Sequence, residues 1–304
     1  MKPVLLITGG SGLLAVNWAM AIRDQYAVTL ALHNRAIALT GVETRQIDLE
    51  SPTQIKTALH RIQPNLVLHA AGLTDVEACE ANPGLAHHVN VELAAHVANA
   101  CAERGINLVH ISTDHLFDGR TVLVSEEEPI APVNRYGETK AMAEVAVLGA
   151  YPQALVVRTN FYGWGTSYRH SFSDKIIHSL RQGEPVVLFE DVFYTPILID
   201  CLANAVHRLV EQNANGIFNV VGDERLSKYA FGIKLAEVFN LDPRLINRGW
   251  LSQCPALVQR PSDMSLSNEK AVKQLGERLG SSGDHLQVLF EQDRQGRAKE
   301  LQTL

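Results

Sequence analysis

The chain has 304 residues, of which 46% are hydrophobic and 20% charged, a balance that excludes a disordered protein and allows a substantial core. Its formal net charge of −6 argues against a nucleic-acid-binding surface, which would be basic. Four cysteines without Cys-x-x-Cys spacing support no metal site and no disulfide framework. With neither a membrane-length apolar run nor a signal-peptide pattern, the sequence predicts a cytoplasmic protein with no membrane contact.

The first predicted element is a buried strand that leads into a glycine-rich turn. Residues 4–7 form a short apolar run, and residues 8–15 read Thr-Gly-Gly-Ser-Gly-Leu-Leu-Ala. Gly9 permits a tight turn, and Gly12 lets the backbone approach a pyrophosphate at the start of the next helix, which Leu13 and Leu14 open. The pattern predicts a dinucleotide-binding start, and an ordinary glycine turn is the alternative.

Strand-like and helical stretches then alternate along the chain. Further apolar runs occur at residues 28–32, 66–69, 108–111 and 154–157. This alternation predicts an α/β protein with a Rossmann-type, doubly wound parallel sheet, in which ligands bind at the carboxyl ends of the strands. We assign residues 1–157 to a cofactor-binding domain and residues 158–304 mainly to a smaller C-terminal substrate lobe. Whether the chain returns to the first domain is left open, and residues 287–304 carry no readable function.

The residues after the second strand bear on the choice of cofactor. An acidic residue at this place would bind the ribose 2′-hydroxyl of NAD, but the sequence reads His33-Asn34-Arg35. The guanidinium of Arg35 suits a 2′-phosphate instead. We therefore predict NADPH, with NADH as the alternative and with Asn34 and Arg35 among the cofactor contacts. A solvated Arg35 at a helix start is the structural alternative.

Tyr136 and Lys140 lie four residues apart and therefore on one face of a predicted helix. A tyrosine has an ordinary pKa near 10 and exchanges protons at neutral pH only if a nearby cation favours its phenolate. We expect Lys140 to lower the pKa of Tyr136 in this way. A long helix can carry such a pair without any catalytic role, but its place downstream of the glycine turn favours a redox enzyme that acts on a carbonyl or hydroxyl group.

With these positions assembled, the chain resembles the extended short-chain dehydrogenase/reductase superfamily and, within it, the dTDP-4-dehydrorhamnose reductase family. The resemblance spans residue 4 to about residue 275. It rests on the glycine turn, on Ser-Thr-Asp-His-Leu-Phe-Asp-Gly at 112–119, on Tyr-Gly-Glu-Thr-Lys at 136–140, on Arg-Thr-Asn at 158–160 and on Arg-Pro-Ser at 260–262. The string at 112–119 is more specific than the glycine turn.

The resemblance implies a catalytic set of Thr113, Tyr136 and Lys140. Thr113 would hydrogen-bond the substrate oxygen, Tyr136 would donate the proton, and Lys140 would hold the nicotinamide ribose. Ser112 is the alternative hydroxyl. The further cofactor contacts that the resemblance implies are Asp48, Leu49, Ala70, Ala71, Gly72 and Asn90. The candidates for the substrate are Thr74, Val76, Phe161 and Arg260, since arginine binds diphosphate oxygens well.

One position narrows the reaction. Related dehydratases are expected to carry Glu where this chain has His115, directly after Asp114, so reduction or oxidation is favoured over elimination, and epimerisation is left open. The first hypothesis is an NADPH-dependent reductase of a keto sugar linked to a nucleotide, with which a homodimer is compatible. The second is a cofactor-binding regulatory protein with a protein partner, resembling the methionine adenosyltransferase β subunit.

Overall fold

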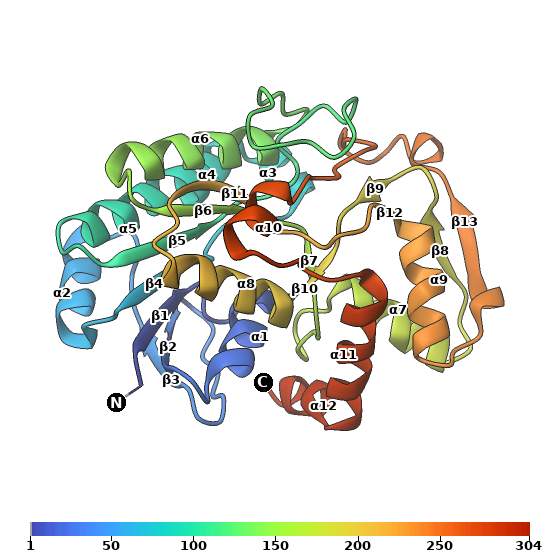
Figure 1. The fold of residues 1–304 in the computed structure, drawn as a ribbon, viewed down its shortest axis with the longest axis horizontal. Helices are drawn as coiled ribbons and strands as arrows, with labels where there is room; N and C mark the ends of the chain where they lie inside the picture. The colour runs from blue at the N-terminus through green and yellow to red at the C-terminus, as the bar shows by residue number, and fades with distance from the viewer. Residues whose placement is uncertain (1) are drawn as a thin grey trace.

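The computed structural model describes residues 2–304, and a seven-stranded parallel sheet lies at its centre with helices on both faces (Figure 1). The strands are β1 (Val4–Thr8), β2 (Ala27–Leu32), β3 (Glu43–Gln46), β4 (Leu66–His69), β5 (Asn107–Ile111), β6 (Leu155–Arg158) and β11 (Gly216–Asn219). Their order across the sheet is β11-β6-β5-β4-β1-β2-β3. The predicted doubly wound α/β fold is therefore confirmed.

The central strands are apolar along their whole length because helices cover both of their faces. Leu5 and Ile7 of β1 pack with the side chains of α1 (Leu13–Ile22) and α8 (Ile199–Glu211). Leu6, between them, packs on the opposite face, in a cluster with residues of three other helices. These are α2 (Pro52–Ile62), α5 (Leu93–Ala102) and α6 (Arg135–Ala150).

Neither edge strand of the sheet is among the strands predicted from the sequence. β3 pairs with β2, with Thr29 opposite Glu43, and β11 pairs with β6, with Leu155 opposite Gly216. β11 belongs to the half of the chain assigned to the substrate lobe, and α8 packs against α1. The chain thus returns to the large sheet after residue 158, while the division at 157/158 stays a prediction.

The second lobe lies on the right of Figure 1 and is built from short strand pairs and two longer helices. Its parts are β8 (Val186–Phe189) with β13 (Ile246–Gly249), β9 (Phe193–Tyr194) with β12 (Leu226–Ser227), α7 (Phe172–Arg181) and α9 (Lys228–Val238). β7 (Phe161–Tyr162) and β10 (Ile197–Leu198) form a further pair. The ring of Phe231 is fully buried and lies 4.9 Å from the ring of Tyr162 and 6.0 Å from that of Tyr194. This aromatic cluster holds the lobe together.

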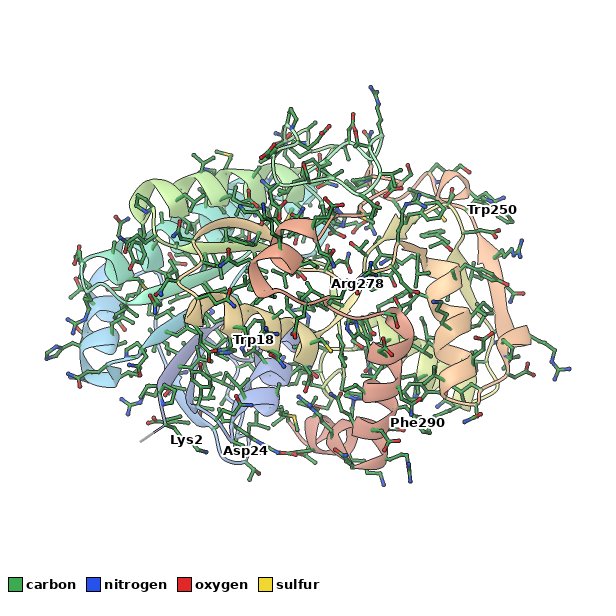
Figure 2. The ribbon with its side chains drawn as sticks, in the orientation of Figure 1. Lys2, Trp18, Asp24, Trp250, Arg278 and Phe290 are labelled. Carbon is green, nitrogen blue, oxygen red and sulfur yellow. The ribbon has the colours of Figure 1, made fainter. Side chains whose placement is uncertain are left out.

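The C-terminal stretch packs against the first helix. It forms α11 (Ser282–Arg294) and α12 (Arg297–Gln302). Glu300 of α12 pairs with Arg23 at 2.6 Å, and Arg297 donates to the carbonyl of Asn17 in α1 at 2.9 Å. Figure 2 places Trp18 of α1 inside the molecule, where its indole donates to His207 of α8 at 3.1 Å.

The remaining helical segments are short and connect the larger elements. They are α3 (Val76–Ala81), α4 (Pro83–His87), a π-helical turn (His88–Glu92), 3₁₀ turns at Pro243–Leu245 and Leu251–Gln253, and α10 (Glu269–Leu275). Within residues 2–304, none of the helices has both the length and the apolar character that crossing a bilayer requires.

Candidate active site

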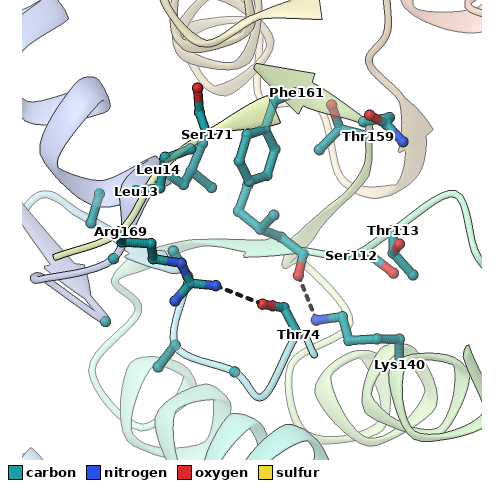
Figure 3. A pocket seen from close by; sticks show the side chains of 18 of the residues that line it. Leu13, Leu14, Thr74, Ser112, Thr113, Lys140, Thr159, Phe161, Arg169 and Ser171 are labelled. Carbon is teal, nitrogen blue, oxygen red and sulfur yellow. Dashed lines mark hydrogen bonds between the residues drawn. The ribbon is translucent and has the colours of Figure 1, made fainter. Parts of the chain in front are cut away.

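A cavity of about 850 Å³ opens at the carboxyl ends of the central strands, between the two lobes. This volume is within the range of cofactor and ligand sites. In Figure 3, Leu13 and Leu14 lie on the opposite side of the view from Thr113 and Lys140. The predicted site residues that line the cavity are Gly9, Gly12, Leu13, Leu14, Arg35, Ala70, Ala71, Gly72, Thr74, Val76, Thr113, Tyr136, Lys140 and Phe161.

Five predicted contacts lie outside the cavity wall. Asn34 and Arg260 do not line it, and Asp48 and Leu49 lie in the loop before α2, where the Asp48 carboxylate accepts the Glu50 N–H at 2.9 Å. Asn90 is buried, and its amide bonds the backbone of Leu73 and the Thr139 hydroxyl. Asn90 therefore shapes the loop under the site. Contact of these five residues with a ligand stays a prediction.

The glycine turn leaves the start of α1 open towards the cavity. Gly9 has a φ of 67°, and a Cβ there would lie 2.8 Å from the backbone of Ala71, so only glycine fits. Gly12 precedes α1, and no side chain caps this helix end. The first N–H groups of a helix lack partners within it and attract anions. This turn therefore fits the diphosphate of a dinucleotide.

Thr113, Tyr136 and Lys140 converge in the cavity, and all three side chains are buried. Thr113 follows β5, whereas Tyr136 and Lys140 come from the first turns of α6, which Asn134 caps. Thr113 lies beside the Tyr136 phenol, close enough to affect its pKa. The three residue types needed to bind a carbonyl oxygen and protonate it thus meet at one place.

The charge state of this set differs from the sequence expectation. Burial raises the pKa of Tyr136 well above its ordinary value, and only the neighbouring Thr113 hydroxyl opposes this shift. Lys140 is not among the groups that lower it; its ammonium donates to the carbonyl of Ile111 at 2.7 Å, and burial lowers the pKa of Lys140 to about 8. The phenol consequently keeps its proton at neutral pH, as a proton donor must.

Ser112, the alternative hydroxyl, also lines the cavity, but its hydroxyl is already hydrogen-bonded to a buried carboxylate. Its Oγ donates to Glu144 at 2.6 Å, and Glu144 forms a two-pronged ion pair with Arg158 at 2.9 and 2.8 Å. The side chains of Glu144 and Arg158 are both 2% exposed. This buried network occupies Ser112 and leaves Thr113 as the hydroxyl beside Tyr136.

Gly137 lets α6 approach the loop that carries Thr113. A Cβ at Gly137 would lie 2.3 Å from the carbonyl oxygen of His115, so Gly137→Ala must push the helix away. We expect a loss of about 1–3 kcal/mol of unfolding free energy and a fall in turnover, measured by urea unfolding and by cofactor oxidation.

Gly149 in the last turn of the same helix provides the matched control, since no atom lies within 4 Å of the position that a Cβ would take there. Gly149→Ala should leave turnover unchanged and raise stability by up to about 1 kcal/mol, because alanine favours helices. Equal stability and turnover in the two variants would contradict the role given to Gly137.

Buried histidines lie under the site and inside the helix layer. His69 bonds Thr8 at 2.8 Å and stacks on His110, while His207 accepts from Trp18. Burial, reinforced by the nearby charge of Lys140, lowers the pKa of His69 to about 3 and holds that of His110 well below its usual value. Burial also lowers the pKa of His207 to about 4. All three are neutral at pH 7.

These depressed pKa values predict destabilisation by mild acid. The unfolded chain protonates histidine near pH 6.5 and the folded chain does not, so lowering the pH below about 6.5 should cost about 1.4 kcal/mol per pH unit for each such histidine. For His207 the loss ends near its folded pKa of about 4. Urea unfolding between about pH 7 and pH 5 measures this slope. His207→Gln should lessen it and exposed His60→Gln should not; an unchanged slope in His207→Gln would contradict the assignment.

A loop from the second lobe crosses the cavity, and sequence reasoning assigns it no role. The Tyr168 hydroxyl donates to the carbonyl of Ser11 in the glycine turn at 2.8 Å, and Arg169 donates to Thr74 at 3.0 Å. The guanidinium carbon of Arg35 lies 4.0 Å from the centre of the Tyr168 ring. The crowding of aromatic residues after β6 is the only signal in the sequence for this wall of the site.

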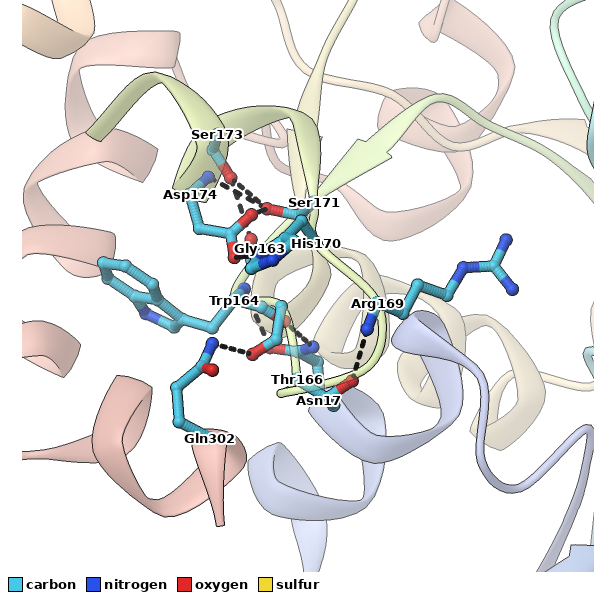
Figure 4. Close-up of polar contacts among 11 residues, drawn as sticks. Asn17, Gly163, Trp164, Thr166, Arg169, His170, Ser171, Ser173, Asp174 and Gln302 are labelled. Carbon is cyan, nitrogen blue, oxygen red and sulfur yellow. Dashed lines mark hydrogen bonds and ion pairs between the residues drawn. The ribbon is translucent and has the colours of Figure 1, made fainter. Parts of the chain in front are cut away.

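Side chains from three helices fix this loop (Figure 4). Asn17 of α1 exchanges hydrogen bonds with the backbone of Trp164 at 2.7 and 3.2 Å. Ser173 of α7 donates to the carbonyl of Gly163 at 2.8 Å, and Gln302 of α12 donates to the carbonyl of Gly165 at 3.3 Å. The C-terminal helix α12 therefore supports a wall of the cavity.

Comparisons with known proteins agree with this geometry. Residues 1–294 match the family model described as RmlD substrate binding domain. The chain is 31% identical over 269 residues to the probable low-salt glycan biosynthesis reductase Agl14 of Haloferax volcanii, across 86% of this chain and 89% of that protein. It is 27% identical over 277 residues to the methionine adenosyltransferase 2 subunit beta of Pongo abelii, across 88% of this chain and 80% of that protein. Among solved structures, a hypothetical dTDP-4-dehydrorhamnose reductase from Sulfolobus tokodaii is similar with a TM-score of 0.79 at 29% identity, across 92% of this chain and 97% of that one.

Proposed function

Because the chain belongs to the family described as RmlD substrate binding domain, we propose that it is an NADPH-dependent reductase of a keto sugar linked to a nucleoside diphosphate. The family predicted from the motifs is the family that the comparisons give. The observation that carries the proposal is the meeting of Thr113, Tyr136 and Lys140 in one cavity, across from the open start of α1.

The chain supplies the groups that hold and protonate a carbonyl. The start of α1 with Gly9 and Gly12 would hold the cofactor's diphosphate, and Lys140 its ribose. When bound, reduced nicotinamide supplies a hydride for the carbonyl carbon. Thr113 donates a hydrogen bond to the carbonyl oxygen, and Tyr136 passes its phenolic proton to the same oxygen as negative charge develops there. A hydride and a proton together convert the keto group into an alcohol.

The test of this function is NADPH oxidation with a panel of nucleoside-diphosphate 4-keto-6-deoxy sugars. We expect saturable loss of NADPH absorbance with at least one member of the panel. The free keto sugar without its nucleotide is the substrate control and should react far more slowly, because the nucleotide supplies the binding energy. If the protein bound NADPH but no sugar of the panel caused its oxidation, the proposal would be contradicted.

Arg35 provides a test of the cofactor preference. Its guanidinium lies on the ring of Tyr168 at the edge of the cavity, where it can meet a 2′-phosphate. We expect Arg35→Ala to raise the KM for NADPH about tenfold or more, the size of one charge-assisted hydrogen bond. The KM for NADH is the internal control and should change little. Equal changes in both values would contradict a 2′-phosphate contact.

A regulatory role is the second candidate, favoured by the similarity to a methionine adenosyltransferase subunit. It predicts tight cofactor binding and a protein partner without turnover. The buried and complete Thr113, Tyr136 and Lys140 set favours the enzyme, because a binding protein has no need of a proton donor beside a hydroxyl.

A further inference from the structure

Lys228, at the start of α9, places an ammonium beside the cavity from the second lobe. Its Nζ lies 3.5 Å from the centre of the Tyr194 ring and 4.8 Å from that of Phe172. Phe172 itself lines the cavity. Two aromatic faces attract the cation and restrict the long side chain, so the charge is fixed where an exposed lysine would move freely.

The surroundings leave this ammonium without an anionic partner. The nearby carboxylate of Asp114 instead accepts hydrogen bonds from the amide of Asn160 and, at 3.3 Å, from Thr113. The neighbouring cation Arg260 pairs with Glu77 at 2.5 Å. Across residues 2–304 no carboxylate forms an ion pair with Lys228. Asp114, His115, Arg260 and Tyr194 are the other titratable groups that face it.

A charged ammonium in this position has a free-energy cost of desolvation, which a bound anionic ligand would offset. Burial lowers the pKa of Lys228 to about 8, only partly opposed by the charge of Asp114. Hydrophobic or neutral side chains would pack on Tyr194 and Phe172 without that desolvation penalty. The neighbouring Lys234 on the same helix, by contrast, has an ion-pair partner in Glu224 at 2.9 Å.

We propose that Lys228 binds the diphosphate of the nucleotide-linked sugar and so places the keto group before Thr113 and Tyr136, an inference that rests on the proposed function. The open start of α1 lies in the first lobe and fits the cofactor's phosphates, whereas Lys228 belongs to the second lobe and lies against Phe172, which lines the cavity. The diphosphate of the cofactor and the diphosphate of the sugar nucleotide would therefore bind at separate places. Arg260 lies close enough to Lys228 for their charges to interact, but Arg260 is itself paired with Glu77, so Lys228 is the cation without an ion-pair partner.

The experiment measures the binding of dTDP and of UDP by calorimetry, in the presence of saturating NADP⁺, to the wild type and to Lys228→Met, Lys228→Arg and Lys234→Met. We expect Lys228→Met to weaken nucleoside-diphosphate binding about tenfold to hundredfold, the range for a charge-assisted contact. Lys228→Arg should retain most of the affinity, and Lys234→Met should match the wild type. Affinity for NADP⁺ should be the same in all four proteins, and thermal unfolding shows whether each variant is folded.

Equal affinity of the wild type and Lys228→Met for both nucleotides would overturn the role of Lys228 and leave the proposed reductase standing. A loss of affinity that accompanies a lowered Tm and that Lys228→Arg does not restore would also overturn it, because the lysine would then be structural. Absence of dTDP and UDP binding by the wild type would instead contradict the proposed substrate class itself.

Discussion

Replacing Tyr136 by Phe should lower kcat for carbonyl reduction by about two to four orders of magnitude, the usual contribution of a positioned acid. The variant loses the phenolic proton, while its ring can still pack with Val76, Cys79 and Ala86 around it. Binding of NADPH should therefore persist. The measurement is the rate of NADPH oxidation at saturating sugar nucleotide, beside a titration of NADPH binding.

Tyr151→Phe is the matched control, because Tyr151 directly follows the same helix and is also buried, away from the cavity. It should reduce the sugar at the wild-type rate. If Tyr136→Phe were as active as Tyr151→Phe, the proton would come from another group and the mechanism would be wrong.

Replacing Glu144 by Gln should cost about 3–5 kcal/mol of unfolding free energy, the size expected when one partner of a buried ion pair is removed. Arg158, whose side chain is 2% exposed, would keep its charge in the core without a counter-ion. Ser112 would also lose its carboxylate partner, and this residue adjoins Thr113. Urea unfolding measures the loss, and turnover should fall with it as the end of β5 shifts.

Glu138→Gln on the same helix is the control for this prediction. Glu138 pairs with Arg135 at 2.6 Å, but both side chains are more than 40% exposed. Solvent screens such a pair, so its loss should lie within the error of the measurement. Equal stabilities of the Glu144 and Glu138 variants would contradict a structural role for the buried pair.

Much of the fold follows from the sequence because its central strands are covered on both faces. The apolar runs at β1, β2, β4, β5 and β6 are long enough to be recognised, and their alternation with helices gives the doubly wound sheet. β3 reads Glu-Thr-Arg-Gln, since an edge strand is solvated and needs no apolar run. β11 has four residues and lies far along the chain, so only tertiary pairing with β6 identifies it.

The motifs likewise predict the first-lobe side of the site, because the residues that line it follow strands of one sheet. Of the wall formed by residues after 157, they predict only Phe161. Tyr168 and Phe172 come from a loop and a helix whose approach depends on the packing of the two lobes. The four-residue spacing also does not predict the direction of the Tyr136 pKa shift, because burial is its largest cause and depends on the tertiary packing.

The most direct measurement is the fate of deuterium from NADPH labelled at the hydride-donating position of the nicotinamide. The protein is incubated with labelled cofactor and a nucleoside-diphosphate 4-keto-6-deoxy sugar, and the product is analysed by mass spectrometry and NMR. We expect one deuterium on the carbon that bore the keto group, and no product with Tyr136→Phe. A sugar that changes configuration without deuterium and without oxidation of NADPH would contradict the reductase and indicate an epimerase.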